Sequence, residues 1–251
     1  MRYFIELSYK GTAYQGFQVQ PNAVTIQSEL ERAIGVVARR AVSLTGSSRT
    51  DSGVHAAQNF FHFDWDGIFE ERLCYNLNAV LPADIAVRAI HPVPDDAHCR
   101  FDALSRTYQY HIYQAKNPFL YDRAWFYPYP LNIELLQSAA GLLKQYSDFT
   151  SFSKKNTQVK SFICRISKSN WAYRDRMYVY EVQANRFLRG MVRALVATML
   201  RVGRGTLSLQ DFQDIIEARD GSRAFFDAPA RGLFLMRVEM PQGLLERGQG
   251  L

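Results

Sequence analysis

Cysteine is scarce in this chain of 251 residues, and its placement is not that of a disulfide framework. The three cysteines, Cys74, Cys99 and Cys164, are odd in number and lie far apart in the sequence. Disulfide-rich folds carry paired cysteines, and zinc or redox sites often use two cysteines separated by two residues. Because neither pattern occurs, we expect three reduced thiols.

Histidine is also sparse, and the motifs of common cofactor-dependent enzymes are absent. None of the five histidines has the His-Glu-x-x-His or His-x-His spacing of a metal site, so we predict no metal. The stretch GTAYQGFQ lacks the lysine and the hydroxyl residue of a phosphate-binding loop, and no Gly-x-Gly-x-x-Gly or Gly-x-Ser-x-Gly motif occurs. These absences leave a cofactor-free enzyme or a binding module.

Long apolar runs are missing as well. No segment approaches the roughly 20 apolar residues of a transmembrane helix. The N-terminal stretch MRYFIELSYK alternates in the manner of a strand and does not resemble a secretory signal. We therefore expect a cytoplasmic protein.

Acidic residues are outnumbered, and the positive excess is unevenly distributed. Residues 1–105 carry 9 basic and 12 acidic side chains, whereas residues 106–251 carry 21 and 12. Arginine supplies 23 of the 30 basic residues, and its planar guanidinium suits contacts with phosphates and bases. A polyanionic partner such as a nucleic acid fits the basic half, although many proteins are mildly basic without one.

Strand-like and helix-like segments follow each other in both halves. RYFIELSY predicts a strand with one apolar face, and the segment after Thr25 predicts a helix with that threonine as its N-cap. The C-terminal half repeats this order of strand, helix and strand. Because no linker or low-complexity segment intervenes, we expect two lobes, residues 1–105 and 106–251, that share one sheet.

The most regular amphipathic pattern lies in the C-terminal half. From Arg186 to Arg204 apolar residues recur at helical spacing, and no acidic residue occurs in the interval. Four arginines are predicted on the opposite face of this helix: Arg186, Arg189, Arg193 and Arg204. Such a face is either simply solvated or bound to a polyanion, and its uniform sign favours the polyanion. A further helix is predicted to start after Ser208.

The last strand, GLFLMRVEM, alternates in the manner of a half-buried strand. We expect Phe234, Met236 and Val238 to face the core. Leu233 and Leu235 are expected to face the opposite side.

A short loop, SSRTDSGVHA at residues 47–56, combines Arg49, Asp51 and His55 around a Ser-Gly turn. Asp, Ser and Gly are common turn formers, so one explanation is a purely structural turn. The other explanation is a loop that exposes a reactive carboxylate. We expect His55 to hold the loop and to take no part in catalysis.

The chain resembles the TruA family of tRNA pseudouridine synthases in the order and spacing of several segments: SRTDSGVHA, LNAVLPADIAV, CRFDALSRTYQY, DFTSFS, FLRGMVR and APARGLFLMRVEMP. The similarity covers about residues 1–241. It implies an α+β protein of two similar lobes that share a mainly antiparallel central sheet flanked by helices, with a basic cleft between the lobes.

The resemblance implies an isomerase that detaches uracil from its ribose and reattaches it through C5 in place of N1, with no cofactor and no metal. Asp51 would be the essential carboxylate. It would act as a nucleophile on C1′ or on the base, or as a base that deprotonates C2′, and the sequence does not select among these roles.

The resemblance also assigns roles to residues far from Asp51 in the sequence. It implies that Arg193 pairs with Asp51 and keeps it ionised, since burial alone would raise the pKa of a carboxylate. Tyr108 would stack on the target uracil and relay the proton lost from C5. Leu235 would place its aliphatic side chain against the base.

We expect Arg49, Arg189 and Arg204 to contact the RNA. The family acts on uridines thirty-eight to forty of the anticodon stem-loop, which implies recognition of RNA shape and a target base that leaves its stack. The resemblance further implies a homodimer. The chain has Ser48 where the family usually has glycine.

Two rival functions remain. A non-catalytic tRNA-binding protein or RNA chaperone on the same fold would bind tRNA without turnover. A small-molecule enzyme that uses Asp51 as a general base would leave the basic helix face unexplained.

Overall fold

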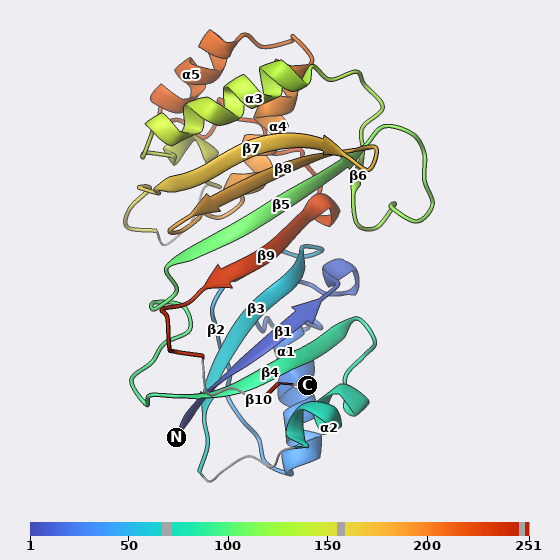
Figure 1. Cartoon of the computed structure of the whole chain (residues 1–251), viewed down its shortest axis with the longest axis vertical. Coiled ribbons are helices and arrows are strands. Elements are labelled where there is room, and N and C mark those ends of the chain that lie inside the picture. Colours follow the sequence, from blue (N-terminus) through green and yellow to red (C-terminus); the bar gives the residue numbers. More distant parts are fainter. Residues whose placement is uncertain (67–71, 155–158, 246–248, 251) are drawn as a thin grey trace. The chain divides into compact units, whose positions relative to one another are not determined.

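The chain forms two compact units, each built from strands and helices (Figure 1). The first unit contains Met1–Leu104 and Leu235–Leu251, and the second contains Ser105–Phe234. The strands of both are mainly antiparallel, which confirms the predicted α+β class and its mainly antiparallel sheet. The computed structural model describes residues 1–66, 72–154, 159–245 and 249–250.

The sheet of the first unit is centred on β1 (Arg2–Tyr9). This strand pairs antiparallel with β3 (His55–Asp64) on one side and with β4 (Ile85–Val93) on the other. Two short strands extend the sheet: β2 (Thr45–Gly46) pairs with β3, and β10 (Gln249–Gly250) pairs with β4. The predicted strand at the N-terminus is thus the centre of this unit.

Two helices belong to the first unit, α1 (Ile26–Ala38) and α2 (Leu73–Val80). Thr25 is the N-cap of α1, as predicted, and its hydroxyl accepts a hydrogen bond from the Ser28 backbone N–H at 3.1 Å. The apolar face of α1 is buried, and α2 contacts both α1 and β4. Capping and burial together fix the start and the orientation of α1.

The second unit contains β5 (Ser105–Tyr113), β8 (Met177–Ala184) and β7 (Ile166–Arg174) in this order across its sheet. These strands pair antiparallel, and the short β6 (Trp125–Phe126) pairs parallel with β5. The fully buried Trp171 and Tyr180 lie opposite each other on β7 and β8, so this part of the sheet faces a core.

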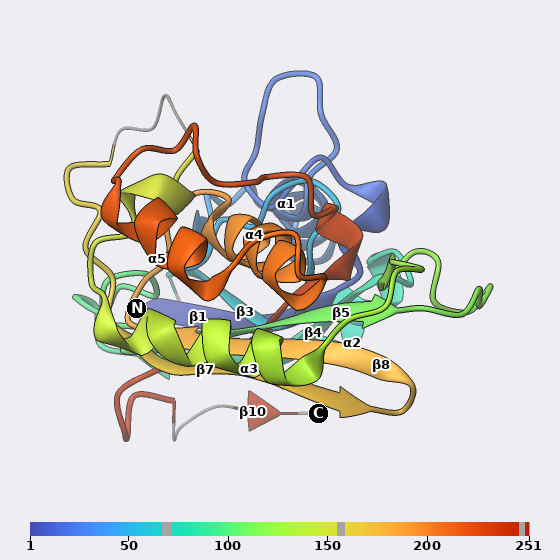
Figure 2. The ribbon, with the colours of Figure 1, turned by 90° about the horizontal axis from the view of Figure 1, so that it is seen from above.

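Three α-helices of the second unit pack on one another, and the first of them also contacts β7 (Figure 2). Leu136 and Gly203 meet where two of them cross, because a Cβ on Gly203 would lie 2.7 Å from a Leu136 methyl carbon. The predicted cap at Ser208 is confirmed, since its hydroxyl accepts from the Asp211 N–H. The helices are α3 (Ile133–Leu142), α4 (Met191–Gly203) and α5 (Leu209–Glu217), with short 3₁₀ turns at Leu143–Gln145, Thr150–Phe152 and Ala230–Gly232.

The predicted basic helix is shorter than expected. It begins at Met191 instead of Arg186, because Gly190 before it has a left-handed φ of 75°. Arg186 and Arg189 therefore precede α4, and the prediction of four arginines on one helix face is wrong. Most of α4 is buried, and Arg193 in its first turn is only partly covered. The amphipathic spacing correctly indicates α4 from Met191 onward, but the helix does not extend back through Gly190 to Arg186.

The last long strand, β9 (Leu233–Glu239), departs from strict alternation. Leu233, Leu235 and Val238 are buried, whereas Phe234 and Met236 are only half-buried. The expected inward face of Phe234 and Met236 is therefore wrong. The Val238 N–H donates to the Gln58 side-chain carbonyl at 3.0 Å.

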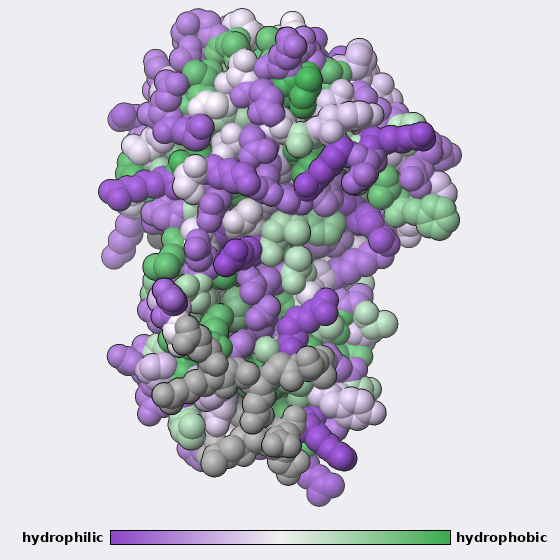
Figure 3. Space-filling view, viewed as in Figure 1, coloured by the Kyte–Doolittle hydropathy of each residue, from purple (hydrophilic) through white to green (hydrophobic). Residues whose placement is uncertain are grey.

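Hydrophilic residues cover most of the face in Figure 3, with apolar residues in smaller groups. Large exposed apolar side chains such as Phe101, Phe119 and Tyr121 come from turns and loops. Within the described ranges, no helix has the length and apolar character that crossing a bilayer requires.

Candidate active site

The loop at residues 47–56 is anchored to β3 at its start. The Ser47 N–H donates to the Phe60 carbonyl at 2.8 Å, and the Asn59 side-chain amide donates to the Ser48 carbonyl at 2.9 Å. Both partners belong to β3, which begins at His55 at the end of the loop. The backbone before Asp51 is therefore fixed over two consecutive residues.

A buried polar network holds the next residue of the loop. The Thr50 hydroxyl and the Tyr9 hydroxyl share a hydrogen bond of 2.8 Å, and the Asn59 amide donates to Tyr9 at 3.1 Å. The Thr50 carbonyl accepts the Phe17 N–H at 3.1 Å. All three polar side chains are buried, so breaking one of these bonds would leave a polar group without water to replace its partner.

Asp51 stands on a tight turn. The Val54 N–H donates to the Asp51 carbonyl at 3.1 Å, and Gly53 has a φ of 78°, which confirms the predicted turn. Burial alternates along the approach: Arg49 is exposed, Thr50 is buried, and Asp51 is half-buried. Arg49 and Asp51 thus lie on either side of Thr50, whose side chain is buried and hydrogen-bonded.

A second segment, residues 11–16, braces the far side of the turn. The Gly11 N–H donates to His55 Nδ1 at 3.1 Å, which confirms that His55 holds the loop. A Cβ on Gly11 would lie 2.0 Å from the Val54 carbonyl oxygen, so only glycine fits there. Gly16 has a φ of 96° and approaches the backbone of the turn. The two glycines of GTAYQGFQ therefore serve this loop, a role that the sequence motifs did not indicate.

Ser48, at a position where the resemblance implies glycine, is accommodated without a left-handed backbone. Its side chain is buried, and its hydroxyl makes no hydrogen bond to any of the described residues. The residue therefore adds a buried hydroxyl to the loop and does not strain its backbone.

The second unit carries the other two predicted catalytic residues. Tyr108 lies on β5 opposite Val182, and its ring meets that of Phe187 edge to face at 5.0 Å. Arg193 lies in the first turn of α4, and its Nε donates to the Ala228 carbonyl at 2.7 Å. Both side chains are partly buried and oriented by contacts within their own unit.

The segment around Ala228, whose carbonyl accepts the hydrogen bond from Arg193, is itself fixed. The Tyr110 hydroxyl donates to the Pro229 carbonyl at 2.6 Å. A Cβ on Gly232 would lie 2.6 Å from the Tyr110 ring, so this glycine permits the close approach. Burial raises the pKa of Tyr110, which keeps its phenol protonated as a donor.

The predicted RNA-contacting arginines of this unit are more open. Arg189 and Arg204 are exposed, and the Arg204 guanidinium lies 4.0 Å from the centre of the Tyr129 ring. Arg201, by contrast, forms an ion pair with Asp227 at 3.2 Å.

The structure buries Leu235 completely. The side chain therefore offers no open surface in this conformation, and contact with a base would require movement of the groups that cover it.

Comparison with known proteins agrees with this architecture. A family model described as tRNA pseudouridine synthase matches residues 7–102 and 142–241. A tRNA pseudouridine synthase A of Porphyromonas gingivalis is 46% identical over 248 residues, covering 97% of this chain and 98% of the relative.

Further relatives of the same name come from Bacteroides fragilis and Staphylococcus aureus. The first is 45% identical and covers 98% of both chains. The second is 36% identical and covers 100% of this chain and 96% of the relative. The family model and the full-length identities show that the chain belongs to the tRNA pseudouridine synthase family.

Proposed function

We propose that this protein converts uridine to pseudouridine in tRNA, with Asp51 as the essential carboxylate. One observation supports this proposal above all: Asp51 lies on a turn that buried hydrogen bonds hold in place. The chain is also similar over nearly its full length to proteins named tRNA pseudouridine synthase A. A reactive group must keep a defined position relative to its substrate, and such bracing provides it.

The reaction is an isomerisation in which atoms and electrons balance within the substrate. The bond from N1 of uracil to C1′ of the ribose breaks, the base turns, a bond from C5 to C1′ forms, C5 loses its proton, and N1 gains one. Asp51 acts either as the nucleophile or as the base that deprotonates C2′. We propose that Tyr108 stacks on the uracil and takes part in removing the C5 proton.

Asp51 must be ionised in each of these roles. A cation near a carboxylate favours its charged form, whereas desolvation disfavours it. We propose that Arg193 supplies this positive charge during the reaction. The hydrogen bond from its Nε to Ala228 supports the proposal, because it restrains the direction of the guanidinium.

The substrate is proposed to be the anticodon stem-loop, with uridines thirty-eight to forty as targets and a homodimer as the binding form. A base in a stem is flipped out at a cost of a few kcal/mol, which stacking and phosphate contacts offset. Exposed Arg49, Arg189 and Arg204 are proposed as phosphate contacts. We propose that Leu235 supports the base through its apolar side chain once the groups that bury it in this structure have moved.

Tritium release from C5-labelled uridine in unmodified tRNA tests the proposal. We expect release by the wild type, none by Asp51→Asn, and tRNA affinity of the variant within about threefold, since one lost charge matters little among many phosphate contacts. Asp66→Asn is the matched control, because Asp66 is an exposed carboxylate of the same unit that pairs with Arg40.

The outcomes separate the alternatives. Release by Asp51→Asn at the wild-type rate would remove Asp51 from the mechanism. Binding of tRNA without release by the wild type would identify a non-catalytic RNA-binding protein. Absence of tRNA binding would favour a small-molecule substrate.

A further inference from the structure

Three potential metal ligands meet in the first unit, outside the Asp51 loop. His62 belongs to β3, and His98 and Cys99 lie in the turn that follows β4. One donor atom from each side chain lies within 4.8 Å of the other two. Among the described residues, this is the one such group of three or more His, Cys, Asp or Glu side chains.

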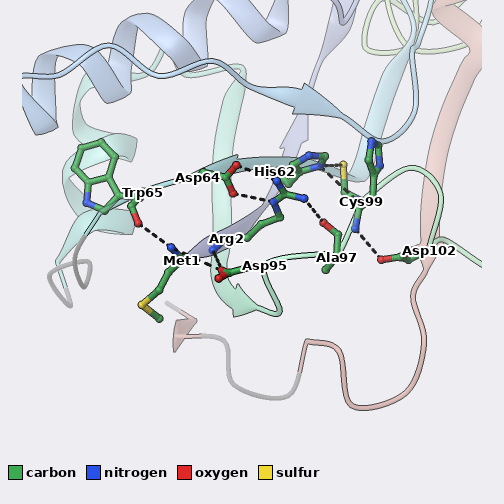
Figure 4. A network of polar contacts seen from close by, with 10 residues as sticks. Met1, Arg2, His62, Asp64, Trp65, Asp95, Ala97, Cys99 and Asp102 are labelled. Atoms are coloured by element: carbon green, nitrogen blue, oxygen red, sulfur yellow. Dashed lines mark hydrogen bonds and ion pairs between the residues drawn. The ribbon is translucent and has the colours of Figure 1, made fainter.

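The spacing of these atoms suits one small ion. His62 Nδ1 and Cys99 Sγ are 3.2 Å apart (Figure 4). Bonds of about 2.0 Å to nitrogen and about 2.3 Å to sulfur place the two ligands of a tetrahedral zinc ion about 3.5 Å apart. The rings of His62 and His98 are also in contact, with centroids 4.5 Å apart. The His62–Cys99 pair thus already has the spacing of two ligands of one ion, and the His98 ring lies beside it.

The backbone already holds the ligands in place. Asp102 accepts the His98 N–H through its carboxylate at 2.7 Å, which fixes the turn. The Cys99 thiol donates to the Thr45 carbonyl of β2 at 3.3 Å. His62 and Cys99 are buried and His98 is half-buried, so a fourth position would open toward solvent on the His98 side.

Charged groups of both signs lie around these three side chains. Arg2 is nearby, but its guanidinium makes two hydrogen bonds to the Asp64 carboxylate, at 2.8 and 2.9 Å (Figure 4). Asp95 and Asp102 add two further carboxylates around the same turn.

We propose that His62, His98 and Cys99 form a binding site for a divalent metal ion of the zinc type, with water as the fourth ligand. Two imidazole nitrogens and one thiolate are a donor set that zinc and cobalt prefer, and that magnesium and calcium do not. The ion would join β3 to the turn after β4 and so stabilise the first unit. This inference does not rest on the proposed function.

Metal binding displaces the thiol proton of Cys99. The S–H bond breaks, the proton passes to the buffer, and a sulfur–metal bond forms with no change in oxidation state. The metal-free alternative needs no ion: the thiol donates to the Thr45 carbonyl, and His62 Nδ1 accepts the Cys99 backbone N–H at 3.4 Å.

Cobalt titration of the chelator-treated full chain tests the site. We expect one Co²⁺ per chain, an absorption band of a cobalt–thiolate bond, and loss of that band when Zn²⁺ is added. Cys99→Ala should abolish the band and weaken Zn²⁺ binding by more than about tenfold. Cys74→Ala, which removes another buried thiol of the same unit, should leave both unchanged.

A second measurement needs no variant. Zinc should shift the ring resonances of His62 and His98 in the wild type and leave those of His55 and His111 in place. No metal retained by the wild type, cobalt without a thiolate band, or equal binding by Cys99→Ala would each overturn the proposal in favour of a hydrogen-bonded thiol.

Discussion

The two units present their functional side chains in contrasting ways. In the first, Asp51 follows a threonine that is buried and bonded to Tyr9, and glycines brace the turn from the other side. In the second, Arg189 and Arg204 are exposed. A carboxylate that reacts must be positioned closely, whereas a guanidinium that attracts phosphate acts through charge and tolerates movement.

The contrast predicts different consequences of mutation. Changes beneath the Asp51 loop should reduce both stability and turnover, because the same contacts fix the fold and the carboxylate. Changes of the exposed arginines should reduce RNA affinity and leave the fold intact, since surface substitutions usually alter stability by less than about 0.5 kcal/mol.

Gly11→Ala should have the largest effect on stability. The new Cβ would lie 2.0 Å from the Val54 carbonyl oxygen, and backbone atoms of a braced turn cannot move aside cheaply. We expect a loss of about 3 kcal/mol or more in the free energy of unfolding, measured by urea denaturation.

Gly35→Ala is the matched control for this change. Gly35 lies in α1, and a Cβ there would meet no atom within 4 Å. Alanine is the better helix former, so we expect a gain of about 0.5–1 kcal/mol. Equal effects of the two substitutions would show that the brace at Gly11 is not rigid.

Much of this architecture was predictable from the sequence. Alternation revealed β1, and helical spacing together with cap residues located the starts of α1 and α5 at Thr25 and Ser208. The turn at Ser52-Gly53 was also predictable, because it depends on local chemistry. These signals are local in the chain, and the structure confirms them.

The remainder depends on contacts between distant residues. Gly11 and Gly16 gave no motif, because their role is to let one backbone approach another. His62 and Cys99 meet only after β3 and the turn beyond β4 come together, so no spacing in the sequence indicates them. The break at Gly190 was missed because the apolar periodicity continues through it.

Thr50→Val should reduce both the stability of the protein and its turnover. The substitution keeps the shape of the side chain but removes the buried hydrogen bond to Tyr9, which should cost about 1–3 kcal/mol. Turnover per folded molecule should fall by about tenfold or more, because the Asp51 loop loses its central anchor.

Thr198→Val makes the same change at a buried threonine of the second unit. Its hydroxyl donates to the Ala194 carbonyl and accepts the Phe225 N–H. We expect a similar loss of stability with turnover unchanged. A drop in turnover as large as that of Thr50→Val would show that the two units respond alike and that the loop has no special dependence on its anchor.

Arg189→Ala and Arg204→Ala should have the smallest effects, confined to RNA binding. Each removes one exposed positive charge, so the slope of log affinity against log salt concentration should become shallower by about 0.7–0.9, with affinity reduced by less than about tenfold. Arg219→Ala is the control, because Arg219 is exposed in the same unit and pairs with Asp148 at 3.2 Å. If all three variants keep the wild-type slope, the arginines are solvated surface groups, and the second unit must bind RNA through other residues. If only Arg219→Ala keeps the wild-type slope, the first unit contributes a fixed carboxylate, and the second contributes a charged surface that tolerates movement.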